Sequence, residues 1–286
     1  MSNRRDFLRK TLTGAAAVAV PAAMANDVLA ANIAPPTMST AFKIGHQFWQ
    51  VRDMLEKDPD GTMKLMSKLG FEGVEYSGMA DPPYPSAIKY RILQNKYNLV
   101  CCGIHYGLTE WIQKGAEPKM EYNYILGNPD LSCHWLDPPQ RGTLENYLSH
   151  AKKFNEYAAE VKRNGFNFYY HNHAFEFTDV FNGKYAMDIM LENTDPALFY
   201  MQLHISGLPA ALDLPKYIRN LGGRLLKLHV PVLDRDGKVS ITQDIIDAAR
   251  ESGSCKWFII EQGVPDKPGC ESLARSVDIL REMLIK

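Results

Sequence analysis

Eight short apolar runs recur along the chain, and each ends at or just before a histidine or a glutamate. The intervals between the runs show either helical spacing of apolar residues or loop composition. Eight alternating β and α units predict a closed parallel barrel, a (β/α)8 TIM barrel of the α/β class. The predicted strands are Phe42–Phe48, Phe71–Tyr76, Leu99–His105, Asp130–Leu136, Phe166–His173, Phe199–Ser206, Arg224–Val230 and Lys256–Gln262.

Helical periodicity fills most of the intervals. It is clearest after Thr143, where apolar residues recur at helical spacing from Leu144 until Asn164-Gly165. The loops Pro82–Pro85 and Leu136–Gly142 follow strand ends, so we expect them to shape the mouth of the barrel. The remaining predicted helices are Asp58–Leu69, Ser86–Tyr97, Tyr185–Asn193, Leu214–Leu221, Ile241–Ser252 and Glu271–Ile285, with a less regular unit over Thr109–Leu126.

The N-terminal segment does not fit the barrel pattern. Arg4-Arg5 is followed by Phe-Leu and by the apolar run Leu12–Ala23, which is too short to span a bilayer. Small residues at Ala23-Met24-Ala25 and at Leu29-Ala30-Ala31 offer cleavage sites. We therefore expect a twin-arginine signal peptide and leader over 1–31, a flexible linker over 32–41 and one barrel domain over 42–286. The alternative is an ordinary basic N-terminus on a cytoplasmic protein.

A twin-arginine signal predicts a periplasmic or otherwise exported protein. This route carries folded proteins, so a metal can be inserted before export. The full chain has 32 basic and 33 acidic residues, and cleavage after Ala25 leaves 28 and 32, a net charge of −4. The absence of a basic excess argues against a nucleic-acid partner, and no stable membrane insertion is expected. The five cysteines form no CxxC pair and are expected to be structural thiols.

The histidines and glutamates at the strand ends suggest a metal site. In such barrels the carboxyl ends of the strands converge on one mouth. Residues two apart on a strand share a face, which groups Tyr169 with His171 and His173, Gln202 with His204, Lys227 with His229, and Ile259 with Glu261. Imidazole and carboxylate ligands suit one divalent ion of zinc, manganese, cobalt or iron better than magnesium alone.

Each residue also has a purely structural interpretation. A single histidine at a strand end is more often a hydrogen-bonded packing residue than a ligand. Glu261 closes the apolar run Trp257–Ile260, where an unpaired buried carboxylate would be costly, so a cation is expected nearby. His229 follows a similar run and is treated as a ligand. Lys227 is either a catalytic base or a buried lysine paired with a carboxylate.

The pattern of the fifth strand resembles a known superfamily. The run Tyr170-His171-Asn172-His173-Ala174-Phe175-Glu176-Phe177 is similar to the HNH-x-x-EF strand of the xylose-isomerase-like sugar phosphate isomerase/epimerase superfamily. The runs 71–75, 223–229 and 258–262 resemble its second, seventh and eighth strands. The resemblance extends from about Phe42 to the C-terminus, and it is more specific for the superfamily than for any single reaction.

The resemblance implies one divalent metal held by residues of the last four strands. By position, His229 and Glu261 match the seventh- and eighth-strand ligands. The fifth-strand ligand is either Glu176, the carboxylate of the matching motif, which is slightly favoured, or His171, nearer the strand end. The sixth strand carries His204 in place of the usual aspartate, which favours softer ions. The expected metal ligands are Glu176, His204, His229 and Glu261.

The seventh strand departs from the superfamily as well, because His229-Val230-Pro231-Val232 replaces the common His-x-Lys-Asp. The usual isomerase contacts to substrate are therefore not expected. The candidate catalytic residues are Glu176, Glu261, His171 and Lys227. The candidate substrate-binding residues are His46, Trp49, Glu75, His105, Trp135 and His173.

The resemblance implies a metal-dependent isomerase or epimerase that removes a proton next to a carbonyl. An exported protein is expected to act on a non-phosphorylated sugar or keto-sugar. One alternative is a lyase or hydrolase of 3-keto-glycosides, which uses the same proton abstraction. Another is a non-catalytic carbohydrate-binding barrel, suggested by the substituted aspartate. A nuclease is disfavoured by the acidic charge and by the single metal site that the pattern supports.

Overall fold

The computed structural model describes residues 42–77, 86–264 and 269–286. The predicted signal peptide over 1–31, the linker over 32–41 and the loop Pro82–Pro85 lie outside the described residues. The described residues between Phe42 and Lys286 form one compact unit. None of the described helices is both long and apolar enough to cross a membrane.

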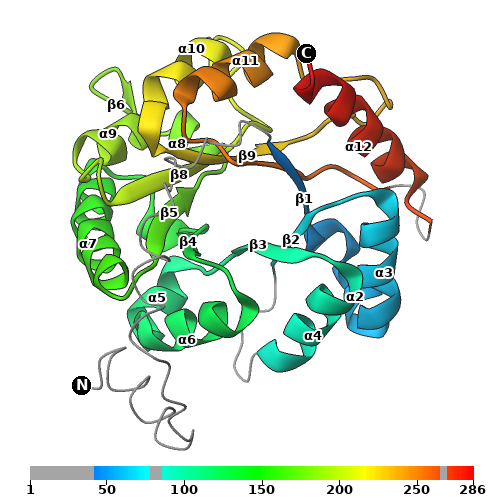
Figure 1. Ribbon diagram of the computed structural model, residues 1–286. Coiled ribbons are helices and arrows are strands. Elements are labelled where there is room, and N and C mark those ends of the chain that lie inside the picture. The colour runs from blue at the N-terminus through cyan, green and yellow to red at the C-terminus, as the bar shows by residue number, and fades with distance from the viewer. Residues whose placement is uncertain (1–41, 78–85, 265–268) are drawn as a thin grey trace, which may run out of the picture. The chain divides into compact units, whose positions relative to one another are not determined.

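Eight parallel strands form the wall of a barrel, in the hydrogen-bonded order β3-β2-β1-β10-β9-β8-β5-β4 (Figure 1). The gap between β3 and β4 is bridged by one parallel pair, Gly107 with Trp135, and by the His134 N–H, which donates to the Tyr106 carbonyl at 3.0 Å. The strands are β1 (Lys43–Gln47), β2 (Gly73–Tyr76), β3 (Val100–Ile104), β4 (Asp130–Cys133), β5 (Asn167–His171), β8 (Phe199–His204), β9 (Leu225–Val230) and β10 (Trp257–Ile260). The predicted (β/α)8 barrel and its eight strands are confirmed.

Helices surround the barrel wall (Figure 1). The longest begins after Thr143, whose Oγ1 accepts a hydrogen bond from the Asn146 N–H at 3.2 Å, as an N-cap should. The helices that cover the wall are α3 (Pro59–Leu69), α4 (Ala87–Tyr97), α5 (Leu108–Lys114), α6 (Glu117–Leu126), α7 (Leu144–Arg163), α9 (Ala186–Glu192), α10 (Leu214–Leu221), α11 (Gln243–Ser252) and α12 (Glu271–Leu284). All the predicted helices are present, and the irregular third unit is two helices, α5 and α6.

Several short elements after the strand ends were not predicted. Helix α2 (Arg52–Lys57) follows β1, and helix α8 (Phe175–Thr178) follows β5. A small antiparallel pair, β6 (Val180–Phe181) and β7 (Lys184–Tyr185), then leads into α9. Helix α8 changes the expected site, because it places Glu176 on a helical turn rather than on the barrel wall.

A buried ion pair lies inside the barrel, towards the amino ends of the strands. The Lys227 ammonium lies 3.2 Å from Asp130 Oδ2, donates to the Cys102 carbonyl at 2.7 Å and sits over the Tyr169 ring. The ammonium of Lys227 and the carboxylate of Asp130, the first residue of β4, compensate each other's desolvation. Lys227 is thus the paired buried lysine of the two interpretations, and its ammonium points away from the mouth.

Four of the five cysteines are buried, and Cys255 is partly buried. Burial raises the pKa of the Cys255 thiol, and likewise that of Cys101, to about 12. These thiols therefore pack as small apolar side chains, as their irregular spacing predicted.

Candidate metal centre

Four side chains from neighbouring strands converge at the mouth of the barrel. They are His171 at the end of β5, His204 at the end of β8, His229 on β9 and Glu261 just after β10. Each offers one ligand atom, and these four atoms lie within 4.8 Å of one another. In-register pairing of His204 with His229 fixes the relative height of two of them. We call these four residues the ligand group.

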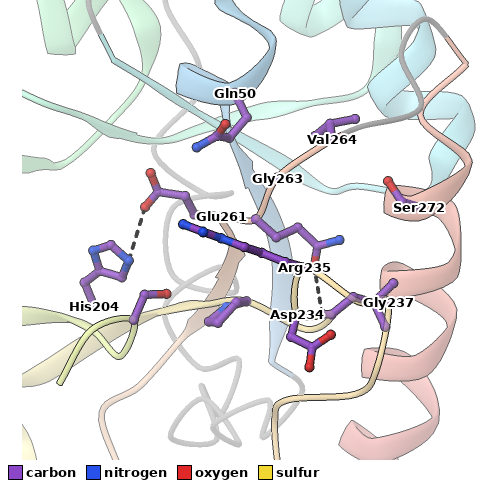
Figure 2. Close-up of a pocket in the computed structure, with 13 residues that line it drawn as sticks. Gln50, His204, Asp234, Arg235, Gly237, Glu261, Gly263, Val264 and Ser272 are labelled. Carbon is purple, nitrogen blue, oxygen red and sulfur yellow. Dashed lines mark hydrogen bonds and ion pairs between the residues drawn. The ribbon is translucent and has the colours of Figure 1, made fainter. Parts of the chain in front are cut away.

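Glu261 lies at the centre of the contacts within the ligand group. Its Oε2 is 2.9 Å from Nδ1 of His229 and 3.6 Å from Nε2 of His204. Figure 2 shows the contact with His204 and the second carboxylate oxygen directed away from it. The imidazole ring of His171 is centred 4.6 Å from that of His229. Three imidazoles and one carboxylate therefore face a common point.

His229 is held from behind by Glu75. The Nε2 of His229 hydrogen-bonds Glu75 Oε2, while its Nδ1 faces the ligand group. A carboxylate behind a metal-binding histidine fixes ring orientation and raises ligand basicity. Gly103 makes room for this carboxylate, because a Cβ there would clash with Glu75 Oε1. Glu75, His105 and His229 also form a second set with ligand atoms within 4.8 Å, sharing His229 with the first.

Gln202 sets the proton positions on two histidines. Its Nε2 donates to the Glu75 carboxylate at 2.7 Å, which leaves Oε1 as an acceptor. This oxygen lies 2.9 Å from His171 Nδ1 and 3.2 Å from His105 Nε2. Both ring nitrogens must therefore carry a proton, and Nε2 of His171 keeps a free lone pair. Gln47 completes the pattern by donating from Nε2 to Nδ1 of His105 at 3.2 Å.

The charge states of the ligand group suit a cation. Burial, together with neighbouring histidines, lowers the pKa of His171 far below its usual range. Burial also lowers the pKa of His204 to about 4, although Glu261 opposes this shift. Burial also lowers the pKa of His229, but the carboxylates of Glu75 and Glu261 outweigh it and raise this pKa to about 9. Burial raises the pKa of Glu261, and His229 lowers it to about 2 overall. Neutral imidazoles and ionised carboxylates are the forms that bind metals, and a cation would replace the proton on His229 Nδ1. The donor set thus fits one divalent ion of the imidazole-favouring kind.

Two cavities meet at the ligand group. The first has a volume of about 680 Å³, and its lining includes His204, Glu261, Gln50, Ser206, Asp234 and Arg235 (Figure 2). The second has a volume of about 400 Å³ and is lined by Gln47, Trp49, Ser77, His105, His134, Trp135, His171, His173 and Glu261. Glu261 lines both, so the ligand group stands at their junction.

The structure brings most of the predicted substrate-binding residues to the second cavity. Trp49, His105, Trp135 and His173 line it. Glu75 is fully buried beneath it and contacts His229 instead of the open space.

His46 is placed differently from the prediction. Its ring packs against Phe48 and Phe71, and it lines neither cavity. Side chains alternate along β1, so Gln47 faces the interior and His46 faces the surrounding helices. The strand-end position of His46 therefore did not indicate a place at the mouth.

The structure does not bring Glu176 into the ligand group. Its carboxylate accepts hydrogen bonds from the Tyr170 hydroxyl and from the His173 N–H, the latter at 2.8 Å. Burial raises its pKa to about 8, above the usual range of a carboxyl. Of the two candidates for the fifth-strand ligand, the slightly favoured Glu176 lies outside the ligand group and His171 within it.

Two glutamines of the site, Gln47 and Gln202, were not among the predicted site residues. Gln202 shares a strand face with His204, and an amide inside an apolar strand needs hydrogen-bond partners. That signal was present in the sequence, but it does not say which partners the amide finds. Arg235 was also missed, because it lies in the irregular loop after β9.

Comparison with known proteins bears on the fold. No protein-family model matches the chain, and no curated protein matches it. A solved structure of a sugar phosphate isomerase/epimerase from Parabacteroides distasonis ATCC 8503 matches with a TM-score of 0.69 and 20% identity, covering 86% of this chain and 96% of that one. D-allulose 3-epimerase from Methylomonas sp., solved in complex with D-allulose, matches with a TM-score of 0.66 and 13% identity over 85% and 97%.

The same fold also serves other chemistry. An AP endonuclease of family 2 from Brucella melitensis matches with a TM-score of 0.59 and 14% identity, covering 82% of this chain and 98% of that one. At these identities the matches establish architecture, and function has to come from the site. The chain thus has the barrel fold of the xylose-isomerase-like sugar phosphate isomerases and epimerases, as its strand motifs suggested.

Proposed function

We propose that this protein is a metal-dependent isomerase or epimerase of a non-phosphorylated sugar or keto-sugar, acting by proton abstraction next to a carbonyl. The observation that carries the proposal is the ligand group, whose ligand atoms converge within 4.8 Å at the junction of two cavities. The fold supports the same interpretation, because several of its structural neighbours are sugar epimerases.

In this proposal His171, His204, His229 and Glu261 hold one divalent ion, of zinc, manganese, cobalt or iron. Such an ion supplies Lewis-acid stabilisation of the negative charge that develops on the carbonyl oxygen. His204 occupies the place of the aspartate usual in the superfamily, and its neutral imidazole keeps the donor count at four.

Glu261 is the candidate base. It reaches both cavities, and its second carboxylate oxygen is directed away from His204, so this oxygen can accept a proton from a substrate carbon placed at the junction. His171 is assigned to ligation. Glu176 and Lys227 are both engaged elsewhere, with Tyr170 and Asp130 respectively.

The second cavity suits a sugar ring. Trp49 and Trp135 offer flat apolar faces, while His173 and Ser77 offer polar atoms that can meet hydroxyl groups. Among the described residues that line this cavity there is no lysine or arginine, which a phosphate group would call for. This lining supports a non-phosphorylated substrate.

Deuterium exchange with metal analysis tests the proposal. The purified protein, loaded separately with Mn²⁺, Co²⁺, Zn²⁺ or Fe²⁺, is incubated in D2O with free ketohexoses and with 3-keto-glycosides. We expect one bound ion per chain and metal-dependent deuterium incorporation next to the carbonyl, detected by NMR. Release of the aglycone would assign a lyase or hydrolase instead of an isomerase.

Two results would contradict the proposal. One is a protein with stoichiometric metal that exchanges no deuterium into any of these compounds. The other is a protein without stoichiometric metal whose sugar affinity is unchanged in His229→Ala, which would indicate a non-catalytic carbohydrate-binding barrel.

We also propose that the chain is exported by the twin-arginine route. The support is the sequence of residues 1–31, with Arg4-Arg5 ahead of the apolar run. Replacing both arginines by lysine should leave the protein in the cytoplasm of a host with this pathway, whereas the unchanged chain appears in the periplasmic fraction. Equal distribution of the two chains would contradict the proposal.

A further inference from the structure

The metal-centre residues are shared between two cavities of different character. His204 and Glu261 line the first, whereas His171 and Glu261 line the second. A reacting atom held at the ligand group therefore has open space on two sides. Pockets that enclose a drug-sized ligand measure roughly 300–1,000 Å³, so each cavity alone, at about 680 and about 400 Å³, is large enough for a sugar unit.

The lining of the first cavity combines apolar surface with polar groups of both charge signs. Asp234 and Arg235 place one carboxylate and one guanidinium on its wall, and Gln50 and Ser206 add an amide and a hydroxyl (Figure 2). The opposite charges offset each other, so a neutral ligand suits this wall better than an ionic one. Oδ1 of Asp234 accepts the backbone N–H groups of Asp236 and Lys238 at 2.9 and 2.8 Å, so a ligand hydroxyl can donate to Oδ2 of this carboxylate and accept from the guanidinium.

The loop that carries Asp234 and Arg235 is held in place. Gln262 Oε1 accepts the backbone N–H groups of Val232 and Leu233 at 3.1 and 3.0 Å. Beyond them, the Asp234 N–H donates to the Lys238 carbonyl at 2.8 Å and closes a tight turn. Because this anchor is the residue next to Glu261, the loop and the metal centre share one support.

We propose that the substrate is a glycoside of at least two units that spans both cavities. The reacting sugar ring lies in the second cavity between Trp49 and Trp135, its carbonyl at the ligand group. A second, neutral and hydroxyl-rich unit lies in the first cavity against Asp234 and Arg235. This inference rests on the proposed function for the position of the reacting carbon, and it adds the substrate class.

The test compares substrates that differ only in the second unit. Deuterium exchange of the metal-loaded protein is measured with 3-keto-glucose and with the 3-keto derivatives of cellobiose and maltose, which represent both anomeric linkages. We expect kcat/KM for one of the disaccharides to exceed that of the monosaccharide by at least about tenfold, a difference of roughly 1.4 kcal/mol. Arg235→Ala should reduce this ratio at least about fivefold, and Lys238→Ala, in the same turn, should leave it unchanged.

Equilibrium binding separates the two proposals. Titration calorimetry with unoxidised glucose, cellobiose and maltose reports affinity without any reaction. If the monosaccharide exchanges deuterium as fast as the disaccharides and binds as tightly, the two-unit substrate is wrong and the proposed function stands. If no keto-sugar exchanges but a disaccharide binds at least about tenfold more tightly than glucose and Arg235→Ala removes the difference, the reaction is wrong and the spanning ligand stands.

Discussion

Strands β5, β8, β9 and β10 bring the candidate ligands to the mouth, whereas β1 to β4 bring side chains that hold those ligands or line the second cavity. Glu261 and Glu75 illustrate the difference. Glu261 is partly exposed and lines both cavities, while Glu75 is fully buried and contacts Gln202, His105 and His229. Two carboxylates at similar strand ends thus have different roles, because one faces open space and the other faces donors.

The largest expected effect on metal binding distinguishes His171, on β5, from His134, which follows β4. His171 belongs to the ligand group, and His134 lines the same cavity and stacks on His105 at 4.7 Å. We expect His171→Ala to weaken metal binding at least about 100-fold, beyond the roughly 10–100-fold loss typical of residues that only orient a ligand. His134→Ala should weaken it less than about tenfold.

Chelator competition with metal analysis of both variants measures this difference. Similar losses of metal affinity in the two variants would contradict the assignment of ligands to strands β5, β8, β9 and β10 and of supporting residues to strands β1 to β4. Thermal unfolding of both variants serves as the control for general damage, since one removes a buried imidazole and the other a partly buried one.

A second pair of variants, at Gln202 on β8 and Gln47 on β1, tests which hydrogen bonds keep the ligand histidines in the form that binds metal. Gln202→Leu removes the acceptor that holds the Nδ1 proton on His171, so the free lone pair at Nε2 is no longer enforced. We expect a loss of metal affinity of roughly 10–100-fold and a changed visible spectrum of the Co²⁺-loaded protein. Gln47→Leu is the matched control, because within the described part of the chain the Gln47 side chain hydrogen-bonds His105 and the Trp49 N–H and none of the four ligands.

A Co²⁺ spectrum that is unchanged in Gln202→Leu would show that His171 keeps its tautomer without this amide. A change of equal size in Gln47→Leu would place the control of the site in the His105 network instead.

The third prediction concerns Glu176, the carboxylate that the fold keeps out of the ligand group. Its folded-state pKa of about 8 lies above the ordinary value of 4.5, so the folded protein retains a proton that the unfolded chain loses. The stability contributed by this proton is present below pH 4.5 and is lost as the pH rises through 8. The free energy of unfolding of the wild type should therefore fall by on the order of a few kcal/mol over this range, and Glu176→Gln should remove this fall.

Denaturant unfolding at pH 5 and pH 8 checks the effect. Between pH 5 and pH 8 the free energy of unfolding of the wild type should fall relative to that of Glu176→Gln. Both proteins are measured metal-free, so that metal affinity does not contribute. A constant difference between the two proteins would mean that Glu176 is ionised in the folded state throughout this range.

The barrel could be predicted from the sequence because its signal is repeated. Each strand is an apolar run of strand length, and helical spacing such as that of Leu144–Arg163 separates the runs. Three of the four residues in the ligand group, His204, His229 and Glu261, were also among the predicted ligands. Their positions follow from the rule that parallel strand ends converge.

The remaining features depend on contacts that periodicity does not encode. Helix α8 turns the chain directly after β5, so Glu176 meets Tyr170 rather than the mouth. The role of Gln202 requires knowing that Glu75, more than a hundred residues earlier, lies opposite it. The first is a local turn that the apolar pattern does not show, and the second depends on the register of strands across the barrel, which a single sequence does not specify.

The smallest expected effect at neutral pH concerns His46, which lies near the end of β1 and faces outward. Within the described part of the chain, neither ring nitrogen has a hydrogen-bond partner, and the ring packs on Phe48 and Phe71. Burial lowers its pKa to about 3, so the folded protein excludes a proton that the unfolded chain binds below about 6.5. Stability is therefore lost as the pH falls from 6.5 towards 3.

His46→Phe removes the two unpaired ring nitrogens and the titrating group, and it keeps an aromatic ring in the same space. We expect a gain of about 0.5–1 kcal/mol at pH 7 from the unpaired nitrogens, growing by roughly 2 kcal/mol at pH 5. Metal content and deuterium exchange should match those of the wild type, because the ring lies outside both cavities. Lower exchange with unchanged stability would return His46 to the substrate site, and the division between outward and inward residues of β1 would then be wrong.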